Sequence, residues 1–127
     1  MKILSPVALG DLQLANRVVM APLTRMRSGE AGVPDDLVAD YYAQRASTGL
    51  IVTEGTYPTQ ESRSYAGQPG IVTDEQQAGW ACVADAVHAI ATLAQGLGDK
   101  LETLEINPLL VRGGSVEALD ALITWGS

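Results

Sequence analysis

Two short, unbroken apolar runs, separated by a helix-forming stretch, constrain the fold of this chain more than any other feature. The runs are residues 17–21 and 50–53. Continuous apolar runs of this kind are typical of strands buried on both faces, as in parallel sheets. The stretch between them opens with Pro34 and two aspartates, which suit the first turn of a helix, and Gly49 is expected to end that helix. The order strand, helix, strand predicts two neighbouring parallel strands.

The segments on either side of this unit extend the β/α pattern. A glycine–aspartate turn between two apolar runs predicts a β-hairpin over residues 7–14. A long loop rich in Gly, Ser, Pro and Gln covers residues 56–72, and loops of that length are usually functional. Thr73 and Gln76 have the spacing of a capping box that opens a second helix. We therefore expect an α/β fold, and both a (β/α) barrel and a doubly wound sheet fit the order of elements.

The pattern changes after the second predicted helix. Gly96 lies in a stretch that breaks the helical periodicity. Residues 105–111 and 116–123 are predicted as the two strands of a C-terminal β-hairpin. A hairpin interrupts the β/α alternation, so we divide the chain into two predicted units, residues 1–90 and 91–127.

Charge and composition limit the partners that we expect. The chain has 15 acidic and 8 basic side chains and a formal net charge of −7, which argues against nucleic acids and anionic membranes as partners. No apolar run approaches the ~20 residues of a membrane span, and the N-terminus lacks the apolar core of a secretory signal. Cys82 is the single cysteine, so no internal disulfide can form. We therefore expect a cytoplasmic protein.

The residues best placed to carry chemistry follow the two predicted parallel strands. In α/β folds, functional groups gather at the carboxyl ends of such strands. Ala21, Pro22, Leu23 and Thr24 follow the first strand, and Glu54-Gly55-Thr56 follows the second. A proline keeps the backbone rigid, a threonine offers a hydroxyl, and a glycine lets a flat ligand approach closely. The same residue types also end strands in ordinary loops, so the spacing alone leaves both interpretations open.

Four longer strings of sequence agree with one known family. They are residues 16–25 (NRVVMAPLTR), 41–46 (YYAQRA), 50–56 (LIVTEGT) and 65–71 (YAGQPGI). In order and spacing, residues 3–89 resemble the N-terminal part of the old yellow enzyme family of FMN-dependent NADH:flavin oxidoreductases. The resemblance implies a TIM-type (β/α) barrel that holds FMN at the carboxyl ends of its strands. It also implies that activated alkenes, which are small-molecule substrates, are reduced with NAD(P)H as the electron donor.

The resemblance assigns roles to individual residues of this chain. It implies that residues 21–24 line the isoalloxazine, with the Thr24 hydroxyl bonding the carbonyl edge of the flavin and tuning its redox potential. Gly55 matches a small residue against the ring, and Tyr65 matches an aromatic that borders the substrate space.

Other functional groups of the family have no counterpart in this sequence. These are the third-strand glutamine, the His/Asn pair that binds the substrate carbonyl, the proton-donating tyrosine and the phosphate-binding arginine. A whole barrel needs roughly 250 residues, of which we expect this chain to supply about a quarter. We therefore assign no catalytic residue, and we expect a truncated barrel that is inactive as this chain.

The tail resembles a second family. Residues 91–123, with the strings Glu-Ile-Asn-Pro-Leu and Leu-Asp-Ala, resemble the end of the ATP-grasp domain of ADP-forming acyl-CoA synthetases and succinyl-CoA synthetase. This resemblance implies that Asn107 and Asp120 reach one Mg²⁺ that bridges nucleotide phosphates, and hard oxygen ligands suit that ion. Considered as residues alone, the two are more ordinary as turn and strand-end residues.

Three functional hypotheses follow from the two resemblances. The chain is an FMN oxidoreductase segment, a Mg-nucleotide-binding fragment of an acyl-CoA ligase, or a chimera with neither activity. A partial barrel leaves bare strand edges and one uncovered apolar face. We therefore expect either homo-oligomerisation, which would cover those surfaces, or marginal stability.

Overall fold

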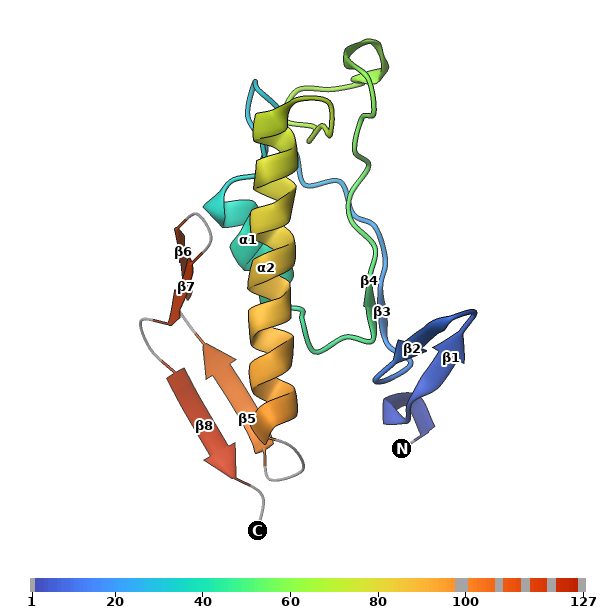
Figure 1. The fold of residues 1–127 in the computed structure, drawn as a ribbon, viewed down its shortest axis with the longest axis vertical. Helices are drawn as coiled ribbons and strands as arrows, with labels where there is room; N and C mark the ends of the chain where they lie inside the picture. Colours follow the sequence, from blue (N-terminus) through green and yellow to red (C-terminus); the bar gives the residue numbers. More distant parts are fainter. Residues whose placement is uncertain (1, 98–100, 107–108, 113–114, 119–120, 126–127) are drawn as a thin grey trace.

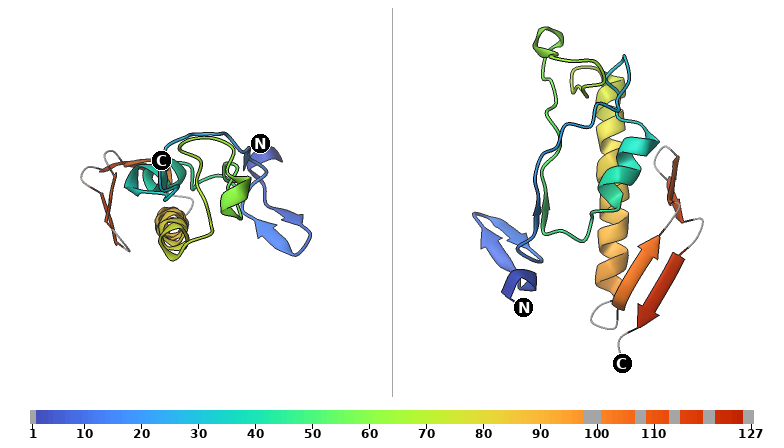
Figure 2. Two further views of the ribbon diagram at one scale, coloured as in Figure 1. Left: turned by 90° about the horizontal axis from the view of Figure 1, so that it is seen from above. Right: turned by 180° about the vertical axis from the view of Figure 1, so that it is seen from behind.

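The computed structural model describes residues 2–97, 101–106, 109–112, 115–118 and 121–125. Along the chain its elements are η1 (Lys2–Leu4), β1 (Val7–Leu9), β2 (Leu12–Leu14), β3 (Val19–Met20), α1 (Asp36–Ala43), β4 (Leu50–Ile51), η2 (Gln60–Ser62), α2 (Asp74–Leu97), β5 (Leu101–Ile106), β6 (Leu109–Arg112), β7 (Ser115–Ala118) and β8 (Ala121–Trp125). The long helix α2 stands at the centre of Figure 1. The β1–β2 and β3–β4 pairs lie on one side of it and β5–β8 on the other, as the rear view in Figure 2 also shows.

The N-terminal hairpin is the one that the sequence predicts. Strands β1 and β2 pair antiparallel, with Val7 opposite Leu14 and Leu9 opposite Leu12. Gly10 sits in the turn with a φ of 59°, a left-handed conformation that glycine adopts without steric cost. The prediction of a hairpin over residues 7–14 is confirmed.

The two central strands are parallel neighbours, as predicted, but they are shorter than the apolar runs. Val19 pairs with Leu50 and Met20 with Ile51. The ladder stops early at β3 because Pro22 has no N–H to donate. The N–H of Val52 still donates to the Met20 carbonyl at 3.0 Å, so the pair is extended by one bond beyond β4.

Helix α1 begins as predicted and ends sooner. The Asp35 side chain caps it by accepting the Val38 N–H at 3.2 Å. The helix ends at Ala43, well before Gly49, so the prediction that Gly49 ends the helix is wrong. Gly49 instead allows close contact with Asn16, whose backbone a Cβ would strike. The Gly49 N–H donates to the Asn16 Oδ1 at 2.9 Å, which ties the turn after α1 to the start of β3.

Helix α2 has the predicted capping box. The Gln76 N–H donates to Thr73 Oγ1 at 3.2 Å, and the Thr73 N–H donates to Gln76 Oε1 at 3.3 Å. The helix runs to Leu97, through Gly96, because a glycine in a helix costs only about 1 kcal/mol and does not stop it. The predicted boundary between residues 90 and 91 therefore falls inside one helix. No helix among the described residues is both long and apolar enough to cross a membrane.

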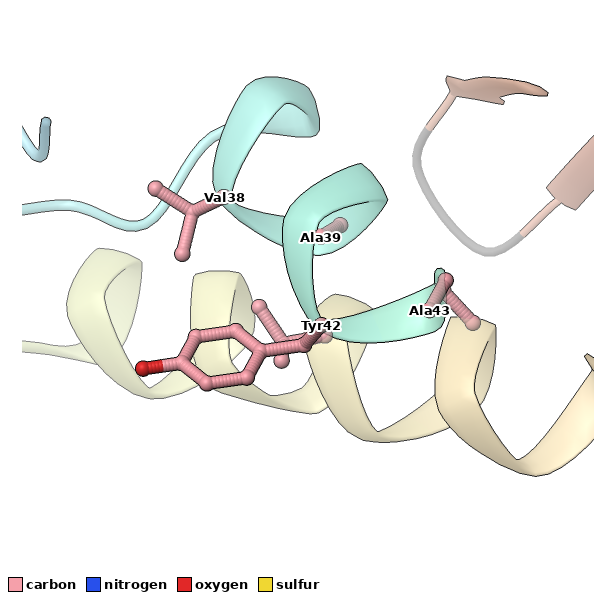
Figure 3. Close-up of a cluster of buried hydrophobic side chains, with 6 residues drawn as sticks. Val38, Ala39, Tyr42 and Ala43 are labelled. Carbon is pink, nitrogen blue, oxygen red and sulfur yellow. The ribbon is translucent and has the colours of Figure 1, made fainter. Parts of the chain in front are cut away.

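The buried core lies between α1 and α2 (Figure 3). Its buried members are Val38, Ala39, Tyr42 and Ala43 from α1, and Val83 and Ala86 from α2. Tyr42 is the largest side chain among these buried members, and its ring tilts against Trp80, with the ring centroids 6.0 Å apart. The strands contribute Met20 and Ile51 to this cluster. Their other face is open in the described part of the chain, with Val19 49% exposed, so burial on both faces, as the apolar runs predicted, is wrong for this chain.

The described residues of the tail beyond α2 lie in four short strands, where the sequence predicts two. Strand β5 pairs antiparallel with β8, and β6 pairs antiparallel with β7, with Arg112 opposite Ser115. The predicted strand 105–111 is thus divided between the end of β5 and β6.

Candidate functional site

The parallel pairing brings the two predicted clusters to one edge of the sheet. Residues 21–24 leave the carboxyl end of β3, and Gly55 lies just past that of β4. Ala21, Pro22, Leu23, Thr24 and Gly55 are all exposed, and Leu23 is 56% exposed. The structure therefore presents an apolar run, one hydroxyl and one glycine, all exposed, beyond the carboxyl ends of two neighbouring parallel strands.

Gly55 has an open space where a side chain would be. A Cβ placed there meets one atom within 4 Å in the described part of the chain, the Tyr65 hydroxyl at 3.8 Å, and the backbone is not left-handed. At the buried or crowded glycines Gly32, Gly49, Gly67, Gly70 and Gly79, a Cβ would clash with the chain itself. Neither packing nor backbone conformation thus requires glycine at position 55. The space fits a flat ring approaching the backbone, as the FMN interpretation needs.

Tyr65 lies beside this space. Its hydroxyl faces the open side of Gly55, and its side chain is half-buried. Gln68, which is 7% exposed, holds the loop that carries Tyr65 in place through hydrogen bonds. Gln68 donates through Nε2 to the Gly55 carbonyl at 3.2 Å and accepts the Ser64 N–H at 2.8 Å. Sequence reasoning did not single out Gln68, and the placement of a glutamine inside a long polar loop gives no local signal of this role.

Glu54 is a second residue whose role the sequence did not reveal. It is 2% exposed, and its backbone N–H donates to the Tyr42 hydroxyl at 2.9 Å. Its carboxylate Oε2 accepts the Arg25 N–H at 2.9 Å. The available signal was a charged residue directly after a buried strand, where a carboxylate needs a partner. Glu54 thus joins α1, β4 and the segment after β3.

A cavity of about 410 Å³ opens next to this junction, on the α1 side. It is lined by Arg25, Arg27, Leu37, Val38, Asp40, Tyr41, Gln44 and Glu54. Burial, and in second place the charge of Asp36, raise the pKa of the Asp40 carboxyl above its ordinary value. Among the described residues, Oδ1 of Asp40 and Oε1 of Glu54 are buried without a hydrogen-bond partner. None of residues 21–24, Gly55 and Tyr65 lines the cavity, so it is separate from the predicted flavin surface.

The predicted metal ligands of the tail cannot be placed. Asn107 and Asp120 lie outside the described residues. Among the residues that are described, no group of three or more His, Cys, Asp and Glu side chains could hold a metal ion.

The β3–α1–β4–α2 unit, with its exposed residues at the carboxyl ends of parallel strands, defines a segment of an α/β barrel that presents its ligand edge. Comparison with known proteins places that segment in a family. The chain belongs to the NADH:flavin oxidoreductase / NADH oxidase family, which matches residues 2–95.

Curated relatives agree with this assignment. Chanoclavine-I aldehyde reductase fgaOx3 of Penicillium roqueforti is 47% identical over 90 residues, covering 69% of this chain and 24% of that protein. The 12-oxophytodienoate reductase 1 of Oryza sativa subsp. japonica is 44% identical over 87 residues, covering 68% of this chain and 23% of that protein. The chain thus spans about a quarter of the length of these relatives.

Solved structures agree as well. Morphinone reductase in complex with tetrahydroNAD superposes with a TM-score of 0.67 at 50% identity, covering 71% of this chain and 24% of that one. The old yellow enzyme from Trypanosoma cruzi gives a TM-score of 0.65 at 40% identity, covering 69% and 24%. The neighbours are old yellow enzyme barrels, so the part of the chain that they cover is a partial α/β barrel, and FMN is the cofactor to which the homologues point.

The resemblance of the tail to ATP-grasp domains gains no such agreement. The family match ends at residue 95, and no comparison supports either the ATP-grasp resemblance or a Mg²⁺ site. The roles assigned to residues 21–24, Gly55 and Tyr65 stay predictions, since the comparisons identify the family and not the individual contacts.

Proposed function

We propose that this chain forms one side of the FMN site of an old yellow enzyme-type oxidoreductase, which reduces activated alkenes with NAD(P)H. The observation that carries the proposal is the open glycine at the carboxyl edge of two parallel strands. Among the described residues, neither packing nor backbone conformation requires a glycine at position 55. Gly55 also lies on the same edge as residues 21–24. A nicotinamide as electron donor is supported by a structural relative, morphinone reductase, which has been solved with tetrahydroNAD.

In this proposal the residues of the chain bind and orient the ring. Ala21, Pro22 and Leu23 offer exposed apolar contact to one face, and Gly55 lets the ring approach the backbone. The Thr24 hydroxyl donates to the carbonyl edge of the flavin, and Tyr65 borders the substrate. Bound FMN would supply hydride chemistry, as flavins do, while the protein supplies position and electrostatics.

We expect this chain alone to bind FMN weakly. The arginine that the resemblance gives to the phosphate and the His/Asn pair that it gives to the substrate have no counterpart in the sequence. A charged phosphate contact and several hydrogen bonds are therefore missing from the binding free energy. Alkene reduction then depends on groups that these 127 residues do not supply.

Titration of the purified chain with FMN tests the proposal, with flavin absorbance and fluorescence as the signals. We expect a shifted absorbance band at micromolar FMN. Gly55→Leu should abolish the shift by filling the ring space, and Thr24→Val should weaken binding about two- to tenfold through one lost hydrogen bond. Gly96→Leu and Thr92→Val are matched controls on exposed positions of α2 and should bind as the unchanged chain does.

Two results would overturn the proposal. One is the absence of any spectral change at high micromolar FMN. The other is undiminished binding by Gly55→Leu, because the proposed ring position would then be wrong. Far-UV circular dichroism of each variant separates lost binding from lost folding, and the open space at Gly55 predicts that this variant still folds.

A further inference from the structure

We propose that Glu54 is a positioning residue, whose buried carboxylate fixes the Thr24–Arg25 peptide and so orients the Thr24 hydroxyl toward the flavin. The inference rests on the proposed FMN function, in which Thr24 touches the ring. Glu54 follows β4, and Thr24 follows β3, so the contact joins the two strands at their carboxyl ends.

The central contact is a hydrogen bond from the backbone to a buried side chain. Oε2 of Glu54 accepts the Arg25 N–H at 2.9 Å. The peptide unit is planar, so the N–H of Arg25 and the carbonyl of Thr24 turn together. A bond that holds this N–H therefore also holds the backbone of Thr24.

Glu54 is itself held from behind by the core. Its N–H donates to the Tyr42 hydroxyl at 2.9 Å, and Tyr42 is 1% exposed in the cluster between the helices. Burial raises the pKa of the Tyr42 phenol above its ordinary value of 10.0, so this hydroxyl stays protonated at neutral pH. The Glu54 side chain is thus anchored to the buried cluster between the two helices, and it extends to the exposed segment after β3.

The segment after Thr24 is fixed at further points. The Arg25 guanidinium lies 4.1 Å from the centroid of the Tyr41 ring, so Arg25 is held by backbone and side chain. Met26 has a φ of 58°, a conformation that side chains other than glycine rarely adopt. Just beyond it, the Ser28 N–H donates to the Gly67 carbonyl at 3.1 Å. A strained residue between two anchors indicates one held conformation rather than a loose loop.

The second carboxylate oxygen argues that folding alone does not account for this residue. Among the described residues, Oε1 of Glu54 is buried and has no hydrogen-bond partner. An unsatisfied buried oxygen on a charged group costs stability. A side chain retained at such a cost is expected where another task requires it, and holding Arg25 is the task that the geometry offers.

Three substitutions at position 54 separate the effect of side-chain length from the effect of side-chain charge. Glu54→Gln keeps the length and one acceptor oxygen without the charge. Glu54→Asp keeps the charge but is one methylene too short to reach the Arg25 N–H, and Glu54→Ala removes both. Gln76→Ala is the matched control, because Gln76 is also a buried polar side chain (1% exposed), and its hydrogen bonds join other residues than Arg25, among them Ala31, Val72 and Tyr57.

Amide hydrogen exchange, measured by NMR in the absence of flavin, tests the hydrogen bond from the Arg25 N–H to Glu54. The quantity is the exchange rate of Arg25 divided by that of Ala39, whose N–H donates inside α1 and reports general opening. We expect Glu54→Ala and Glu54→Asp to raise this ratio about tenfold or more, and Glu54→Gln to keep it within about threefold. Gln76→Ala should leave the ratio unchanged. If Glu54→Ala does not fold, the Glu54→Asp and Glu54→Gln pair decides the question by itself.

FMN titration of the same variants measures how the loss of this hydrogen bond changes flavin binding. We expect the Glu54→Asp chain to bind FMN about tenfold more weakly with a changed absorbance band, and Glu54→Gln to restore both. Equal exchange ratios in Glu54→Asp and the unchanged chain would overturn the inference, as would Glu54→Gln and Glu54→Asp behaving alike. If the exchange ratios change as expected while the unchanged chain binds no FMN, the hold on Thr24 stands and the proposed function fails.

Discussion

The two faces of the β3–β4 pair differ in how far the chain completes them. The face toward the helices contributes Met20 and Ile51 to a cluster of buried side chains. On the opposite face Val19 is 49% exposed and Val52 is 40% exposed. A β/α unit can build its helix layer from its own residues, whereas the inner face of a barrel strand is covered by other strands of the barrel. The difference shows that this segment carries its own outer layer but not its barrel interior.

The same contrast divides stability from function. On the helix side, side chains are buried and hydrogen-bonded within the chain, as where Trp80 Nε1 donates to the Gly70 carbonyl at 3.1 Å. At the carboxyl edge of the strands, Thr24 and Gly55 are exposed. The chain spans about a quarter of the length of its relatives, and it holds a well-packed helix pair beside an open ligand edge. The helix pair should determine the free energy of unfolding, and the ligand edge should determine the affinity for the ligand.

The largest expected effect comes from removing the central side chain of the helix face. Tyr42→Ala deletes a ring that is 1% exposed and the hydroxyl that accepts the Glu54 N–H. Truncation of a buried aromatic should lower the free energy of unfolding by about 3–5 kcal/mol. Urea unfolding followed by far-UV circular dichroism measures it. Leu37→Ala, in the same helix but 59% exposed, is the control and should change the free energy by less than about 1 kcal/mol. Similar losses in the two variants would mean that the helix face is not the stabilising one.

Local signals explain what the sequence could predict of this fold. The hairpin, the parallel pair and the capping box of α2 depend on residues close together in the chain, and all three are confirmed. The end of α1 was predicted wrongly, because Gly49 is fixed by contact with Asn16 and not by helix termination. A glycine required for close approach and one that ends a helix look alike in a sequence.

The position of the candidate site could be predicted from the sequence, but the hydrogen bonds that hold its residues in place could not. Placing residues 21–24 and Gly55 at one edge needs only the parallel order of two strands. The hydrogen bond from Arg25 to Glu54 spans 29 positions, and the one from Gln68 to Gly55 spans 13. Contacts across such separations leave no periodic pattern, so they became visible only in the structure. The open space at Gly55 was likewise hidden until neighbouring atoms could be measured.

A smaller effect is expected from the uncovered strand face, and it should appear in association rather than in folding. The apolar exposure of Val19 and Val52 predicts self-association that buries this face. Val19→Thr with Val52→Thr keeps shape and strand propensity while adding two hydroxyls. We expect the dissociation constant to rise about tenfold in sedimentation equilibrium, with unfolding changed by less than about 1 kcal/mol. Val72→Thr, 38% exposed outside the strands, is the matched control and should associate normally. A chain that is monomeric at all concentrations would contradict this prediction.

The smallest effect concerns a charge at the edge of the helix face. Burial, followed by the charge of Asp36, raises the pKa of the Asp40 carboxyl above its ordinary value of 3.8. The folded chain therefore binds this proton more tightly than the unfolded chain does, so stability falls as the pH rises from the ordinary value through the raised one. Asp40→Asn removes that loss, and it should be more stable than the unchanged chain at pH 7 but not below about pH 4. We expect no more than about 0.5 kcal/mol at pH 7, since the carboxyl keeps contact with solvent.

Urea unfolding at pH 7 and at pH 3.5 measures this dependence on the charge of Asp40. Asp85→Asn, an exposed position on α2, is the control and should show the same pH dependence as the unchanged chain. The buried, unpartnered Oδ1 of Asp40 gives the prediction its sign, because an ionised oxygen without a partner weakens the folded state. An Asp40→Asn chain less stable at pH 7 would show that the carboxylate has a favourable partner, and the helix face would then depend on a charge as well as on packing.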